Sequence, residues 1–147
     1  MPELWTDERV AALPSWSVIR THLLLAPRLA RTLAPVGLSP TQFGVLVQLD
    51  NTPGATSSEL ARACLMTPQS MSELLPGLEA AGYVHRAAAG RGRPAPVRLT
   101  GAGRDVLTRA TPLVEDADRP EALGLQPDEL ATLTALLNRV AEQVSGP

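Results

Sequence analysis

Lysine is absent from this sequence, and cysteine, aromatic residues and long apolar runs are scarce. The single cysteine, Cys64, excludes an internal disulfide and a cysteine-based metal site. The longest uncharged apolar run, from Leu23 to Pro27, is far too short to cross a bilayer. The N-terminus lacks the basic segment followed by an apolar one that marks a secretion signal. We therefore expect a cytoplasmic protein with no membrane partner.

Groups suited to catalysis or metal binding are also few. The chain has two histidines and one cysteine, with no glycine-rich phosphate loop and no paired carboxylates in an apolar setting. None of its serines stands in a nucleophile elbow. We expect no enzymatic activity, no cofactor and no metal site.

The composition favours one globular domain whose charges are unevenly distributed along the chain. The chain has 147 residues, of which 44% are hydrophobic and 19% charged. The net charge is -2, but the segment 84–104 carries five arginines and no acid, whereas 105–147 carries eight acids and three arginines. Phosphate binding needs only a local positive patch, so the net charge does not exclude a nucleic-acid partner.

Capping residues and apolar spacing predict a mainly helical chain. Apolar residues at three- and four-residue spacing indicate a long helix over about 15–33, with Pro27 inside it. Capping boxes at Ser39 and Thr56, and the pair Thr67-Pro68, indicate helices that begin near residues 40, 57 and 68. Two further helices are expected over about 101–118 and from 127 onward. The last carries an apolar stripe of Leu130, Leu133, Leu137, Val140 and Val144.

A hairpin is expected between these groups of helices. Residues 83–87 and 96–99 read as short strands, and the loop between them contains Gly90-Arg91-Gly92-Arg93. Two short helices followed by a two-stranded hairpin make a winged helix-turn-helix, here over about 39–100. In such a motif the first helix braces the second, which enters the major groove of DNA.

The helix expected from residue 68 has the two faces that base recognition requires. At about 100° per residue, one side gathers the apolar residues Met71, Leu74, Leu75, Leu78 and Ala81. Gln69, Ser72 and Glu73 lie opposite. A glutamine can pair with adenine through two hydrogen bonds, and a glutamate can accept one from cytosine. Thr67 and Ser70 lie at the helix start, where free N–H groups can meet a phosphate.

Four segments resemble the MarR family of regulators: 58–62 (SELAR), 67–72 (TPQSMS), 78–84 (LEAAGYV) and 97–104 (VRLTGAGR). The order of the elements, with helices on both sides of the winged helix, resembles that family too. The resemblance implies a homodimer that is joined through the first and last two helices and binds a palindromic operator in double-stranded DNA. It also implies that a ligand or an oxidant relieves DNA binding.

The expected fold is therefore a single MarR-like domain over 1–147, mainly α with a small β-hairpin. The winged helix-turn-helix at about 39–100 is flanked by N- and C-terminal dimerisation helices at about 15–35 and 101–145. The expected function is a sequence-specific DNA-binding transcriptional regulator, a repressor released by a small aromatic or phenolic effector. The alternative is a winged-helix module for protein interaction or dimerisation without specific DNA binding. Such a module has no need of an acid-free arginine segment.

The residues expected to contact DNA lie in the second helix and the hairpin: Thr67, Pro68, Gln69, Ser70, Ser72, Glu73, Arg86, Arg91, Arg93 and Arg98. The residues expected to contact the effector are Trp16, His22 and Phe43. The family often places acids beside its hairpin arginines, whereas this loop has none. Pro76 is expected to bend the recognition helix, which concentrates base contacts before it.

Several of these residues have structural interpretations that the sequence leaves open. Glu73 can be an ordinary surface residue, and Trp16 and His22 can belong to the core or to an interface. Cys64 lies on the apolar side of a short helix, which favours a buried structural thiol over a redox sensor. The acids Glu3, Asp7 and Glu8, with Trp5, suggest a short arm that packs on a partner subunit.

Overall fold

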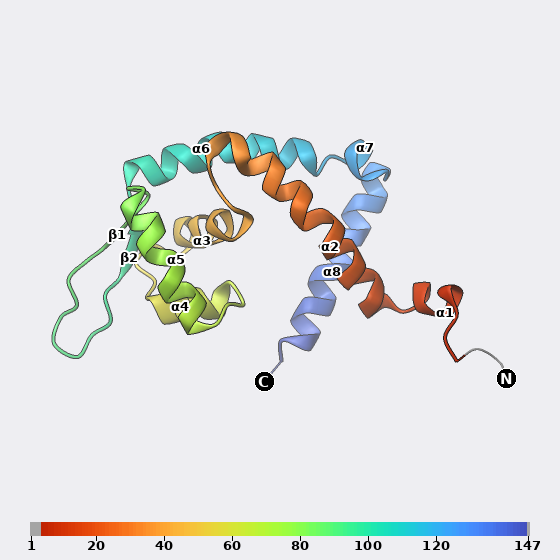
Figure 1. The fold of residues 1–147 in the computed structure, drawn as a ribbon, viewed down its shortest axis with the longest axis horizontal. Helices are drawn as coiled ribbons and strands as arrows, with labels where there is room; N and C mark the ends of the chain where they lie inside the picture. Colours follow the sequence, from red (N-terminus) through yellow and green to blue (C-terminus); the bar gives the residue numbers. More distant parts are fainter. Residues whose placement is uncertain (1–3, 147) are drawn as a thin grey trace.

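The computed structural model describes residues 4–146 and confirms a mainly helical chain with one small hairpin. In chain order the elements are α1 (Asp7–Ala11), α2 (Pro14–Leu33), the 3-10 helix η1 (Ala34–Val36), α3 (Pro40–Asn51), α4 (Ser57–Ala63), α5 (Pro68–Ala80), β1 (Val84–Arg86), β2 (Val97–Leu99), α6 (Gly101–Ala117), α7 (Pro120–Leu123) and α8 (Pro127–Val144) (Figure 1). The two strands pair antiparallel, with Val84 opposite Leu99 and Arg86 opposite Val97.

The arrangement separates a compact winged helix-turn-helix from a more open group of helices. Figure 1 shows α6 across the top of the molecule, with α3, α4, α5 and the hairpin below its N-terminal end. Helix α2 descends from α6, and α8 descends from α7 at the opposite end. The hairpin loop and the two termini lie far apart.

Side-chain caps fix where three of the helices begin, as the sequence predicts. Ser39 Oγ accepts from the N–H of Gln42 at 3.1 Å, and Gln42 Oε1 accepts from the N–H of Ser39 at 2.9 Å. Thr56 and Glu59 make the same reciprocal pair at 3.2 Å and 2.7 Å. The backbone N–H of Thr56 is the main cause of a lowered pKa for the Glu59 carboxyl group. At α5, Thr67 Oγ1 accepts from the N–H of Ser70 at 3.1 Å.

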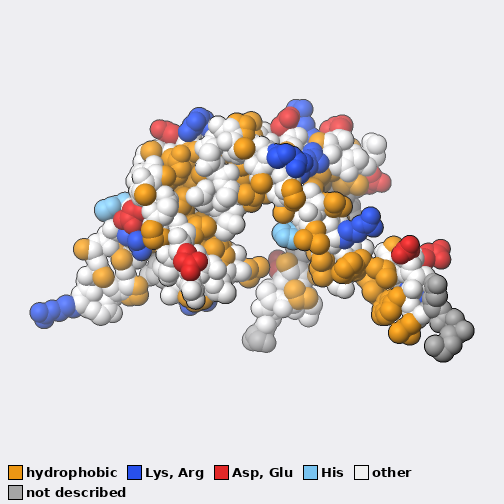
Figure 2. Space-filling view, viewed as in Figure 1, with side chains coloured by type: hydrophobic (Ala, Val, Ile, Leu, Met, Phe, Trp, Pro, Cys, Tyr) orange, Lys and Arg blue, Asp and Glu red, His pale blue; other side chains and the backbone are white. Residues whose placement is uncertain are grey.

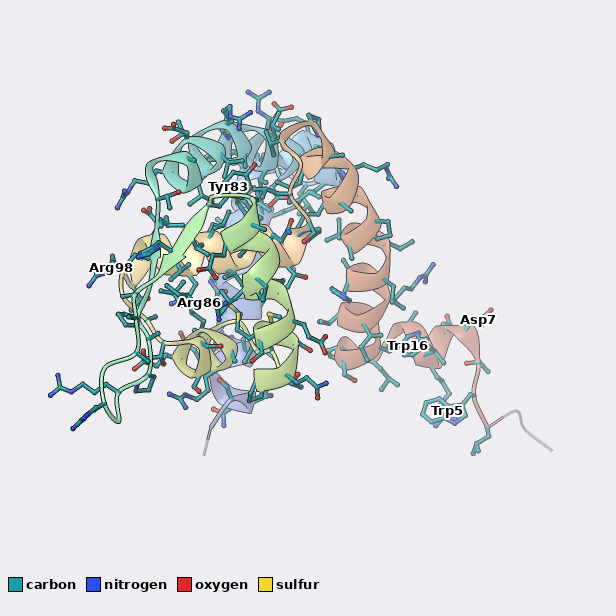
Figure 3. The ribbon with its side chains drawn as sticks, turned by 60° about the vertical axis from the view of Figure 1, so that its left-hand side comes forward. Trp5, Asp7, Trp16, Tyr83, Arg86 and Arg98 are labelled. Atoms are coloured by element: carbon teal, nitrogen blue, oxygen red, sulfur yellow. The ribbon has the colours of Figure 1, made fainter. Side chains whose placement is uncertain are left out.

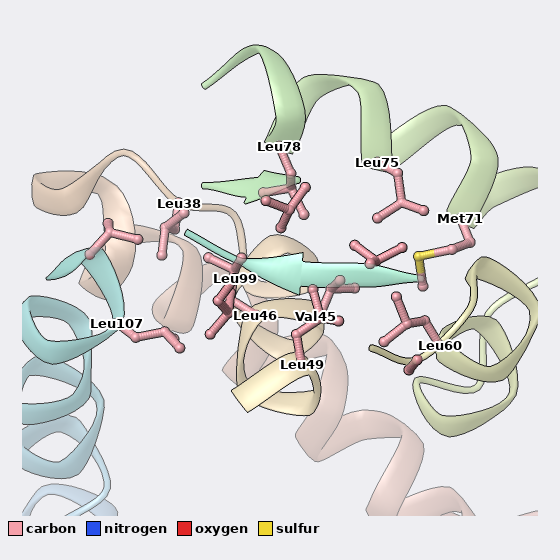
Figure 4. Close-up of a cluster of buried hydrophobic side chains, with 14 of the residues drawn as sticks. Leu38, Val45, Leu46, Leu49, Leu60, Met71, Leu75, Leu78, Leu99 and Leu107 are labelled. Atoms are coloured by element: carbon pink, nitrogen blue, oxygen red, sulfur yellow. The ribbon is translucent and has the colours of Figure 1, made fainter. Parts of the chain in front are cut away.

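The core lies between α3, α4, α5, the hairpin and the first half of α6 (Figure 4). Helix α5 buries Met71, Leu75 and Leu78 completely and half-buries Leu74. Ala81, expected on the same face, is exposed, because the helix ends at Ala80 and turns away through Gly82 at φ 76°. This burial holds α5 firmly and leaves its other face to solvent.

Two short helices lie where the sequence shows no periodicity. Helix α1 occupies the predicted N-terminal arm, with Asp7 and Glu8 in its first turn and Thr6 as its cap. Helix α7 interrupts the stretch between α6 and α8. Glu3 lies outside the described residues. Helix α2 continues through Pro27 and α5 through Pro76, so neither proline ends its helix. The bend expected at Pro76 remains a prediction.

Candidate nucleic-acid interface

The outward face of α5 is polar and open to solvent. Thr67, Pro68, Gln69, Ser70, Ser72 and Glu73 are all exposed, so the structure brings these six expected contacts onto one surface. The face exists because the apolar residues of α5 repeat at helical spacing and turn toward the core. Helix α4 packs against α5 from the other side and fixes its position.

Two hydrogen bonds organise the side chains on this face. Gln69 Nε2 donates to Glu73 Oε1 at 3.2 Å, and Thr67 Oγ1 donates to Ser70 Oγ at 2.9 Å. Because an ionised carboxylate only accepts, Gln69 must turn its amide nitrogen toward Glu73. One amide hydrogen and the amide oxygen remain for a base. Glu73 is therefore placed to orient Gln69, in addition to the base contact expected for it.

The hairpin loop presents a positive tip. Arg91 and Arg93 are exposed in a turn that a hydrogen bond from the N–H of Arg93 to the carbonyl of Gly90 closes at 3.0 Å. Figure 2 shows basic side chains that project from the end of this loop. Among the described residues, no ion pair involves either arginine. Their charge is available to phosphates.

Arg86 and Arg98 are held closer to the protein (Figure 3). Arg86 Nη2 lies 2.9 Å from Glu79 Oε2, an ion pair that ties β1 to the end of α5. Arg98 packs over Gly54, where a Cβ would lie 3.0 Å from Arg98 Nη2. Glu79 lies outside the acid-free segment 84–104, so the charge of that segment alone does not reveal that Glu79 offsets part of the charge of Arg86.

The junction between the hairpin and α6 is unusually tight. The N–H of Thr100 donates to the carbonyl of Tyr83 at 3.1 Å, and Thr100 Oγ1 donates to the carbonyl of Gly82. Thr100 Oγ1 also caps α6 by accepting from the N–H of Gly103 at 3.0 Å. A Cβ on Gly103 would overlap the Tyr83 carbonyl oxygen. This contact fixes the hairpin relative to α5 and α6.

The three expected effector contacts do not come together within one chain. His22 lines a cavity of about 190 Å³ with Leu25, Arg28, Thr32, Pro40 and Asp118. Trp16 lies in a groove between α1 and α2, beside Asp7 and Arg20. Phe43 is partly buried and packs on the core. Of the three, His22 is the residue that faces a cavity between α2, α3 and the end of α6.

Cys64 lies at the end of α4 and is half-buried, where full burial was expected. Burial raises the pKa of its thiol, which lowers the fraction of reactive thiolate. The described residues hold no group of three or more His, Cys, Asp and Glu side chains that could bind a metal ion. Between residues 4 and 146, no helix combines the length and apolarity needed to span a membrane.

An exposed polar helix, braced by a shorter one and flanked by an arginine-tipped hairpin, defines the class of winged helix-turn-helix DNA-binding proteins. Residues 36–93 match the MarR family model. The chain is 41% identical over 100 residues to the HTH-type transcriptional repressor Rv2887 of Mycobacterium tuberculosis, a match that covers 67% of this chain and 72% of the repressor. The chain belongs to the MarR family and is a DNA-binding transcriptional regulator.

Solved structures of the family share this fold. The transcriptional repressor CouR bound to a 23-mer DNA duplex superposes with a TM-score of 0.84 at 29% identity, over 93% of this chain and 98% of CouR. CouR bound to p-coumaroyl-CoA gives 0.78 at 30% identity, over 95% and 98%. Rv2887 in complex with salicylic acid gives 0.72 at 34% identity, over 88% and 96%.

Proposed function

We propose that this chain is a homodimeric repressor that reads a palindromic operator with α5 and binds the flanking phosphates with its hairpin loop. The observation that carries the proposal is the exposed face from Thr67 to Glu73 together with the guanidinium groups of Arg91 and Arg93, which make no ion pair within residues 4–146. Support comes from CouR and Rv2887, which are named repressors and were both solved with DNA.

A second copy of the chain is proposed to cover the apolar helices at its two ends. Leu23 and Leu24 on α2 are 63% and 67% exposed, and Val140 on α8 is 55% exposed. Figure 2 shows apolar side chains gathered over α2 and the N-terminal region. Monomeric proteins rarely leave apolar patches of this extent open. We infer a hydrophobic interface of the large class, above about 2,000 Å².

An aromatic carboxylic acid is the proposed effector, bound in the cavity that His22 lines. The cavity of about 190 Å³ lies below the range of about 300–1,000 Å³ that drug-sized ligands occupy, which favours a single-ring molecule. Arg28 on its wall supplies a positive charge. Its guanidinium also donates to the carbonyls of Ala117 at 2.9 Å and Ala122 at 3.1 Å, so a carboxylate that recruits Arg28 loosens α2 from α6 and α7.

Trp16 and Phe43 do not line this cavity within one chain. Of the three residues expected to contact the effector, the proposal therefore uses only His22. The relatives give the ligand class its support, since CouR was solved with p-coumaroyl-CoA and Rv2887 with salicylic acid.

The test of DNA recognition is selection from a random-sequence duplex library by the purified full-length protein. We expect enrichment of an inverted repeat whose half-sites lie about one helical turn apart, or a multiple of it, as two-fold symmetry requires. Binding to random duplexes without any enriched sequence would contradict operator recognition. No binding at low salt would favour the protein-interaction alternative.

The effector is tested by titrating salicylate into the complex with the selected duplex. We expect salicylate to release the wild-type protein from the duplex and to release His22→Ala less. Because the His22 side chain is exposed, its removal should leave the fold intact. Thr21→Ala is the matched control, because Thr21 lies outside the cavity on the same turn of α2. Equal release of all three proteins would show that salicylate acts elsewhere.

A further inference from the structure

Leu65 joins α4 to α5 in a backbone conformation that leucine rarely adopts. Its φ is 53°, the one positive value at a non-glycine residue in the described part of the chain. The N–H of Leu65 donates to the carbonyl of Arg62 at 3.2 Å, and the N–H of Met66 donates to that of Ala61 at 2.8 Å. This pair of hydrogen bonds is the Schellman motif, and Leu65 stands at its left-handed position, where glycine is the usual residue.

The part of the chain that the structure describes gives the Leu65 side chain almost no cover. Its side chain is 89% exposed, the highest fraction of any large apolar side chain between residues 4 and 146. The neighbouring Cys64 and Met66 are partly buried and pack against the core, so the turn is anchored without Leu65. A Cβ in the left-handed region also opposes the conformation sterically. Residues in unfavourable backbone conformations are enriched at binding sites, and this favours a role for Leu65 in contacting a ligand.

The surroundings of Leu65 bear on the identity of that ligand. Leu65 shares an open groove with Thr67, Ser70 and Glu73, three of the expected DNA contacts. It precedes the first residue of α5 by three positions. When the N-terminal turns of α5 enter a major groove, the turn before them lies at the groove edge. Duplex DNA offers apolar surface there, in the thymine methyl groups and the carbons of deoxyribose.

We propose that Leu65 is a DNA contact, whose side chain becomes buried against the apolar surface of the duplex at the edge of the major groove. The inference rests on the proposed function, because it requires α5 to be the helix that enters the groove. The Leu65 contact would add an apolar contribution to DNA binding beside those of the polar face of α5 and the arginines of the hairpin loop. It would also explain why a leucine occupies a position where glycine would be more stable.

Three variants of the full-length protein separate a DNA contact from a structural role. Leu65→Gly and Leu65→Asn both tolerate the left-handed conformation and lack the apolar side chain. We expect each to melt at the wild-type temperature or above it and to bind the selected duplex at least about tenfold more weakly, since a leucine side chain is lost from each half-site. Leu65→Met keeps an apolar side chain and should bind within about threefold of wild type.

A modified duplex distinguishes the two apolar sources. Replacement of single thymines by uracil removes only the methyl group. If one such position weakens wild-type binding but not Leu65→Gly binding, the contact is a thymine methyl. The contact is a deoxyribose if Leu65→Gly and Leu65→Asn lose affinity equally on selected and random duplexes and no uracil replacement weakens wild-type binding. Wild-type affinity in Leu65→Gly and Leu65→Asn overturns the inference, whereas a failure of the wild-type protein to select any sequence overturns the proposed function instead.

Discussion

Replacement of Arg91 and Arg93 by alanine is expected to weaken binding to every duplex and to reduce its salt dependence. A dimer presents four of these guanidinium groups, and none is engaged in an ion pair in the described residues. If each neutralises one phosphate, the slope of log K against log salt falls by about 3.6, at about 0.9 for each contact. Between 50 and 200 mM salt, the wild type should then lose about 150-fold more affinity than the double variant does.

The assay is fluorescence anisotropy with the selected duplex and with a random duplex of equal length, at four or more salt concentrations. Arg91→Lys with Arg93→Lys is the matched control, because lysine keeps the charge in the same loop. Its slope should stay near that of the wild type. If the alanine variant keeps the wild-type slope, the loop makes no phosphate contact.

Three further outcomes follow from single contacts. Gly103→Ala should destabilise the fold by about 1–3 kcal/mol in thermal denaturation, because the added methyl group meets the Tyr83 carbonyl, whereas Gly101→Ala has open space and should not. Glu59→Gln should melt at a lower temperature than the wild type at pH 7, and the difference should vanish as the pH falls through about 4 and below. The pKa of Glu59 is lowered in the folded protein, so protonation of its carboxylate removes the stabilisation that it provides. Leu137→Asp, in the exposed stripe of α8, should convert a dimer into a monomer in sedimentation equilibrium, and a folded wild-type monomer at micromolar concentration would contradict the proposed interface.

Helix starts could be predicted because they depend on residues three positions apart. The Ser39–Gln42 and Thr56–Glu59 pairs form locally, so the sequence alone indicates them. The polar face of α5 follows in the same way from helical periodicity. Helices α1 and α7, with five and four residues, are too short for any periodicity to emerge.

Contacts made by tertiary structure could not be predicted. The Arg86–Glu79 ion pair forms because β1 folds back along α5, and no spacing rule reveals it. The cavity at His22 requires α2, α3 and the end of α6 to meet. The left-handed conformation of Leu65 is also hidden, because the glycine that normally signals such a turn is missing.

Gln69→Ala, measured at a single salt concentration, tests whether α5 reads the base sequence. One amide hydrogen of Gln69 donates to Glu73, which leaves the second amide hydrogen and the amide oxygen for adenine, which pairs through one acceptor and one donor. We expect a loss of about 1–3 kcal/mol of binding free energy on the selected duplex and almost none on a random duplex. Equal weakening on both duplexes would show that the helix contributes affinity without reading sequence.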